Sequence, residues 1–163
     1  MNPTGEITEH ITAFLHEIGI PTRVTELTGS TVLPGIRIER GTILYDEAQL
    51  LYPGDLLHEA GHLAMMTPEQ RQAAHADTGD DGGFEMAAIA WSYAAALHID
   101  IDPAIVFHPH GYFGGGQNIL TNFSQGNFFG VPILQWLNMT VEPGKRGPHD
   151  PEHFPHMRKW LRD

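Results

Sequence analysis

The sequence contains no cysteine. Disulfide bonds and thiolate chemistry are therefore excluded, and any bound metal ion must be held by nitrogen and oxygen ligands. Basic residues are also few, because nine Lys and Arg stand against twenty Asp and Glu and give a formal net charge of −11. Binding to a phosphate backbone needs a basic patch, so we expect no nucleic-acid partner.

Long hydrophobic runs are absent as well. No apolar stretch approaches the length of a membrane span, and the N-terminal residues lack the basic segment and apolar core of a signal peptide. We therefore expect a cytoplasmic protein with no membrane partner. The 163 residues, 41% of them hydrophobic, are enough for one domain and too few for two, which predicts a single domain over residues 1–163.

What the sequence does contain is an HExxH pattern, His58-Glu59-Ala60-Gly61-His62. On an α-helix, residues four apart project from one face, so His58 and His62 can bind one metal ion. Glu59 is one residue out of phase with the first ligand, and its carboxylate could deprotonate a metal-bound water as a general base. The pattern therefore favours zinc-dependent hydrolysis.

The residues around this pattern are typical of an amphipathic helix. Apolar residues recur at helical spacing and form a stripe separate from the face that carries the His and Glu side chains. Pro53-Gly54 interrupts the chain just before it, Asp55 is suited to the N-cap position, and Thr67-Pro68 ends it.

A catalytic zinc site needs a third protein ligand and leaves its fourth position to water. Residues 84–98 are the longest helical pattern downstream, and Glu85 is the only acid in it. A lone Glu at the start of an otherwise apolar helix is costly to bury unless it is paired or metal-bound, so Glu85 is the favoured ligand. His75, Asp80 and Asp81, on the connection between the two helices, are the alternatives.

These features resemble a known family. The segment 35–46, the HEAGH helix and a helix that opens with Glu85 and carries Ile89-Ala90 resemble, in this order, the ImmA/IrrE-type zinc peptidases. In that family a short β-hairpin precedes an HELGH-like helix, and the following helix supplies an acidic third ligand. The resemblance covers residues 35–97.

The resemblance implies an α+β, zincin-like fold of the HExxH plus Glu (gluzincin) kind. A small antiparallel sheet would pack on the HExxH helix and on the following ligand-bearing helix, with the core at about residues 35–98. Zn²⁺ would be bound by His58, His62 and Glu85, and Glu59 would be the general base. The substrate would be a peptide or a protein.

The remaining pattern predicts a first helix and a small sheet. Residues 7–18 carry apolar residues at helical spacing, and a glycine and a proline follow them. Residues 22–27 and 36–45 are β-like, with Arg40-Gly41 as the turn between two strands.

The segment 103–139 is rich in aromatic residues, glycine and asparagine, and we expect it to form a shaped loop that serves as a lid or a substrate wall. His110, His108 or Tyr112 could then donate a hydrogen bond to the oxyanion that forms during hydrolysis. The alternative is a set of ordinary turns that pack the edge of the domain. Its large apolar residues are expected in the core or in a homo-oligomer contact: Phe128, Phe129, Ile133, Leu134, Trp136 and Leu137.

The C-terminal residues combine basic and imidazole side chains. Arg158, Lys159 and Arg162 are expected on the solvated face of a short terminal helix. Prolines spoil the helical spacing of three histidines, which are therefore expected to be exposed rather than metal-bound: His149, His153 and His156.

The sequence thus predicts a zinc metallopeptidase that hydrolyses a peptide or amide bond by metal-activated water. Two alternatives remain open. One is a catalytically silent regulatory or protein-binding module with the zincin fold and a retained metal site. The other is a subunit that acts mainly by self-association through the aromatic segment after Val106.

Overall fold

The computed structural model describes residues 2–31, 33–75, 82–144 and 152–163. Within these ranges the protein is a mixed α+β structure with seven α-helices, one short 3₁₀ helix and a three-stranded sheet. The elements in chain order are α1 (Pro3–Ile18), β1 (Thr22–Val24), β2 (Ile36–Glu39), β3 (Thr42–Tyr45), α2 (Asp55–Met65), α3 (Pro68–Ala73), α4 (Gly82–His98), α5 (Pro103–Val106), the 3₁₀ helix η1 (Tyr112–Gly114), α6 (Gly116–Ser124) and α7 (Val131–Trp136).

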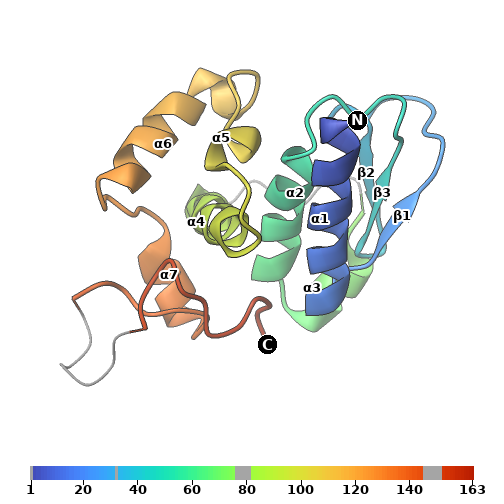
Figure 1. Ribbon diagram of the computed structural model, residues 1–163. Coiled ribbons are helices and arrows are strands. Elements are labelled where there is room, and N and C mark those ends of the chain that lie inside the picture. The colour runs from blue at the N-terminus through green and yellow to red at the C-terminus, as the bar shows by residue number, and fades with distance from the viewer. Residues whose placement is uncertain (1, 32, 76–81, 145–151) are drawn as a thin grey trace.

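Helix α2 stands in the middle of the molecule. Figure 1 shows α1 and the sheet on one side of α2. Helix α4 lies on the other side, and α5, α6 and α7 lie beyond α4. Helices α1 and α4 both contact α2, and α2 also contacts strand β3. One hydrophobic cluster includes buried residues of α1, the sheet, α2, α4 and α7. The HExxH helix is therefore held from both sides by packed elements.

Helix α1 begins earlier than its apolar pattern indicates. The side chain of Asn2 accepts a hydrogen bond from the backbone N–H of Gly5 (3.2 Å), so the first turn is capped although it contributes little to the core. The C-terminus of α1 agrees with the prediction, because Gly19 (φ 98°) takes the left-handed conformation that ends the helix.

The predicted hairpin is present, but the sheet is not wholly antiparallel. β2 and β3 pair antiparallel, with Glu39 opposite Thr42. β1 pairs parallel to the other edge of β3, with Thr22 opposite Ile43, which gives the strand order β1-β3-β2. The expectation of an antiparallel sheet was wrong at β1, because the apolar pattern of a strand does not encode the direction of its partner.

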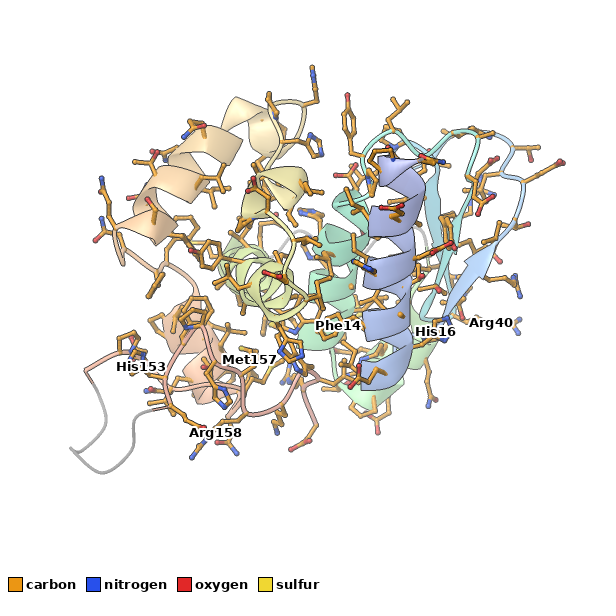
Figure 2. The ribbon with its side chains drawn as sticks, viewed as in Figure 1. Phe14, His16, Arg40, His153, Met157 and Arg158 are labelled. Carbon is orange, nitrogen blue, oxygen red and sulfur yellow. The ribbon has the colours of Figure 1, made fainter. Side chains whose placement is uncertain are left out.

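The turn of this hairpin needs two residues in the left-handed conformation, and one of them is Arg40 (φ 49°), followed by Gly41 (φ 76°). Arg40 lies at the outer end of the sheet (Figure 2). Asn tolerates this conformation better than Arg, so Arg40→Asn is expected to stabilise the protein by up to about 1 kcal/mol. A rise in Tm of about 2–4 °C in thermal unfolding would be the result.

Strand β1 offers the control for this prediction. Arg23 is exposed and has no left-handed backbone, so Arg23→Asn is expected to bring no gain. An unchanged or lower Tm for Arg40→Asn would show that the turn does not strain the folded protein.

The segment 103–139 is not the loop that its composition indicates. It forms helices α5, α6 and α7, with η1 between α5 and α6. Ile119 and Phe123 lie one turn apart on α6 and are buried, so packing overrides the low helix propensity of the Gly and Asn residues around them.

The large apolar residues of this segment mostly pack as expected. Leu134 is fully buried, and Phe128, Phe129, Ile133 and Leu137 contact the core. Trp136 differs, because it is 74% exposed.

The C-terminal residues 152–163 contain no helix, contrary to the prediction. Arg162 instead bonds to the end of α2: its backbone N–H donates to the carbonyl of Ala64 (2.9 Å), and its guanidinium donates to that of Met65 (3.2 Å). Arg71 of α3 in turn donates to the carbonyl of Arg162 (2.8 Å). The two bonds that Arg162 donates satisfy carbonyls at the end of α2 that lack partners within the helix, and Arg162 is therefore not part of a solvated face.

Two of the three C-terminal histidines, His153 and His156, are exposed as expected, and His149 lies outside the described residues. Figure 2 shows His153 and Arg158 at the outer surface of the C-terminal segment. In the described parts of the chain, no helix combines the length and the apolar character needed to cross a membrane.

Candidate metal centre

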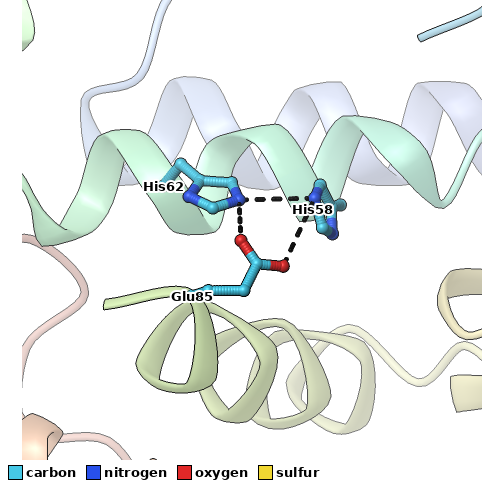
Figure 3. A group of neighbouring side chains, drawn as sticks. All are labelled: His58, His62 and Glu85. Carbon is cyan, nitrogen blue, oxygen red and sulfur yellow. Dashed lines mark hydrogen bonds and ion pairs between the residues drawn. The ribbon is translucent and has the colours of Figure 1, made fainter. Parts of the chain in front are cut away.

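Helix α2 places the two histidines of the HExxH pattern on one face, as the helical period requires. The Nε2 atoms of His58 and His62 lie 3.3 Å apart (Figure 3). Two ligand atoms at about 2.0–2.1 Å from a tetrahedral zinc ion are separated by about 3.3 Å, so the two imidazoles already have the spacing of zinc ligands.

Helix α4 brings Glu85 to the same point from across the helix–helix contact. Its Oε2 atom lies 2.7 Å from Nε2 of His62, and its Oε1 atom lies 3.9 Å from Nε2 of His58. The three ligand atoms lie within 4.8 Å of one another, and this is the one group in the described chain that could hold a metal ion. Two nitrogen ligands and one oxygen ligand suit zinc and leave a fourth position open, although the geometry does not select one metal.

A close approach of α2 and α4 makes this arrangement possible. A Cβ atom on Gly61 would lie 2.9 Å from the carbonyl oxygen of Ala88 and 3.1 Å from Oγ of Ser92. The Ser92 hydroxyl also hydrogen-bonds across the contact to the carbonyl of Leu57 (3.3 Å). Because Ala88 lies one turn after Glu85, glycine at position 61 lets the first turn of α4 come within reach of the histidines.

The electrostatics prepare two of the three side chains, His58 and Glu85, for metal binding at neutral pH. Burial, and next the charge of His62, lower the pKa of His58 to about 4, so its imidazole is neutral and has a lone pair to offer. The hydrogen bond from His62 lowers the pKa of Glu85, which is therefore ionised. No proton has to leave His58 or Glu85 when a cation enters.

Glu59, the predicted general base, is buried, with 2% of its surface exposed. Its Oε1 atom lies 4.0 Å from Nε2 of His58, at the side of the three-ligand group. A carboxylate at this position would be close enough to act on a water molecule held by a cation bound to the three ligands.

The three candidate oxyanion donors lie in different environments. Tyr112 contacts His58, but its hydroxyl oxygen lies 2.7 Å from Nδ1, the ring nitrogen that faces away from the other two ligands. His108 is buried, with Nε2 2.7 Å from Oδ1 of Asp55. His110 is exposed and stacks on Tyr52 with ring centroids 5.4 Å apart. None of the three belongs to the three-ligand group.

The structure places one of the three alternatives for the third ligand. His75 forms an isolated bridge with Glu39 near the turn of the hairpin and is not part of the metal group. Asp80 and Asp81 lie outside the described residues.

Sequence reasoning missed the role of Asp55. It was expected to cap α2, but Gly54 holds the cap position and Asp55 is the first residue of the helix. Its side chain is buried and bonds to His108. One signal was available, because Asp55 precedes His58 by three residues and therefore shares its helix face.

No protein-family model, no curated protein and no solved structure matches this chain. By its fold and its site, this is a mixed α+β protein with a candidate metal centre of two histidines and one glutamate.

Proposed function

We propose that this protein is a zinc-dependent peptidase of the zincin type, as the resemblance to ImmA/IrrE-type zinc peptidases implies. The observation that carries the proposal is the convergence of His58, His62 and Glu85 beside the buried carboxylate of Glu59. A metal site that serves only structure is normally closed by four protein ligands and has no use for a base.

In this proposal the residues of the chain have three roles. His58, His62 and Glu85 would hold the cation, which would lower the pKa of a bound water to about 7 and polarise the carbonyl of the substrate. Glu59 would take a proton from the attacking water and transfer it to the leaving nitrogen. The small sheet could orient an extended peptide by backbone pairing at an edge, which demands little of the peptide's sequence.

The metal content of purified protein tests the site. Wild-type protein prepared without chelator is expected to contain about one zinc per chain in elemental analysis, and Glu85→Ala to contain less than about a tenth of that. Zinc at a hundredfold excess over Kd should raise the stability of wild type by about 2.7 kcal/mol, or the Tm by about 5–10 °C.

Glu69 provides a matched control, because it is an exposed acid in the first turn of α3. Glu69→Ala is expected to bind zinc as wild type does. Full zinc content in Glu85→Ala would place the third ligand elsewhere, and no zinc uptake by wild type would remove the basis for hydrolysis.

A further inference from the structure

The segment before α6 has an unusual backbone conformation where it lies against α2. Tyr112 (φ 55°) and Phe113 (φ 53°) are successive non-glycine residues in the left-handed region. The result is that the Tyr112 ring packs against Phe107 and reaches His58, while Phe113 stays fully exposed. Strain of this kind persists only where the surrounding structure enforces it, and it is concentrated at functional sites.

The hydrogen bonds around His58 determine which of its nitrogens carries the proton. The carboxylate of Glu85 only accepts, so Nε2 of His62, 2.7 Å away, must donate. Nε2 of His58 lies 3.3 Å from that same protonated nitrogen and must face it with its lone pair. The proton of the neutral His58 ring is then on Nδ1 and is donated to the Tyr112 hydroxyl oxygen (2.7 Å).

A buried hydrogen bond between two side chains fixes the segment that carries Tyr112. His108 donates from Nε2 to Asp55, which is one turn before His58 on α2. The other polar atoms of the pair, Oδ2 of Asp55 and Nδ1 of His108, are buried without a hydrogen-bond partner in the described chain. In the described chain this is the one side-chain hydrogen bond of either residue, and losing either partner leaves the other buried polar group with none.

We propose that Tyr112 is a positioning residue that accepts the Nδ1 proton of His58 and so turns Nε2 toward the metal, and that the Asp55–His108 pair holds Tyr112 in this position. The proposal rests on the metal centre of the proposed function, but its first test needs no metal. Groups that hydrogen-bond a ligating imidazole commonly change metal affinity by about 10–100-fold.

The first measurement is the tautomer of His58 in metal-free wild-type protein, read from the two ring-nitrogen resonances in ¹⁵N NMR. Nδ1 is expected to be protonated and Nε2 to be unprotonated. In Tyr112→Phe the two resonances are expected to move toward each other, because the favoured tautomer loses its acceptor. Protonated Nε2 in wild type would overturn the proposal whether or not the protein binds zinc.

The second measurement is the zinc Kd in competition with a chromogenic chelator. Tyr112→Phe is expected to bind zinc about 10–100-fold more weakly than wild type. Tyr52→Phe is the matched control, because it also removes only a hydroxyl, in this case from a ring that stacks on His108 with ring centroids 4.1 Å apart. A Kd for Tyr112→Phe within twofold of that control would overturn the role of Tyr112 and leave the metal site intact.

The Asp55–His108 pair is tested by a destructive and a conservative change. His108→Leu is expected to weaken zinc binding about as much as Tyr112→Phe, whereas His108→Gln, whose amide can still donate to Asp55, should recover most of the affinity. Wild-type affinity in a folded His108→Leu protein would overturn the role of the pair, and so would a Gln variant that is folded and no better than Leu.

Discussion

Glu59→Gln is expected to bind zinc as wild type does and to hydrolyse peptides at least about 100-fold more slowly. Gln keeps the size of the buried side chain and one accepting oxygen but cannot accept the proton of the attacking water, and general-base catalysis contributes about 10²–10⁴ to a rate. The measurements are zinc content and the initial rate on those members of a fluorescence-quenched peptide library that wild type cleaves.

Glu69→Gln makes the same chemical change on an exposed surface and should retain the wild-type rate. An active Glu59→Gln protein would show that Glu59 is not the base. A wild-type protein that holds zinc and cleaves no member of the library would favour the catalytically silent binding module instead.

Gly61→Leu is expected to destabilise the protein by about 1–3 kcal/mol and to weaken zinc binding. The added side chain has no room, because even a Cβ atom at this position would lie 2.9 Å from the carbonyl oxygen of Ala88. Helix α4 would have to move away from α2 and take Glu85 with it. Gly61→Ala should cost less, because alanine adds only the Cβ atom to the contact and its helix propensity, about 1 kcal/mol better than that of glycine, offsets part of the clash.

Chemical denaturation and the zinc Kd measure both parts of this prediction. Ala13→Leu is the control, because it enlarges a small exposed residue on helix α1, where there is space. If Gly61→Leu matched that control in stability and in zinc affinity, close packing of the two helices would not be what positions Glu85.

The sequence was most informative where the structure is local. The two histidines and Glu59 follow from the period of a single helix, and the hairpin follows from the strand-like run 36–45 with Arg40-Gly41 as its turn. Composition was misleading where packing outweighs propensity, as in α6, where the buried side chains of Ile119 and Phe123 keep a Gly- and Asn-containing segment helical.

The third ligand shows how far a sequence pattern reaches. Glu85 was favoured as the only acid on the next long helix, but its contact with His62 depends on the crossing of α2 and α4 at Gly61. The parallel partner of β1 and the course of residues 152–163 were likewise decided by contacts between distant segments.

By itself, then, the sequence determined the face of α2 that carries His58, Glu59 and His62, because helical geometry is a property of neighbouring residues. Only the tertiary structure decided that Tyr112 lies on the Nδ1 side of His58 and that Asp55 pairs with His108. These contacts join residues more than fifty positions apart through a strained turn. No spacing rule encodes them, because they arise only when the packed core brings α2 and the segment before α6 together.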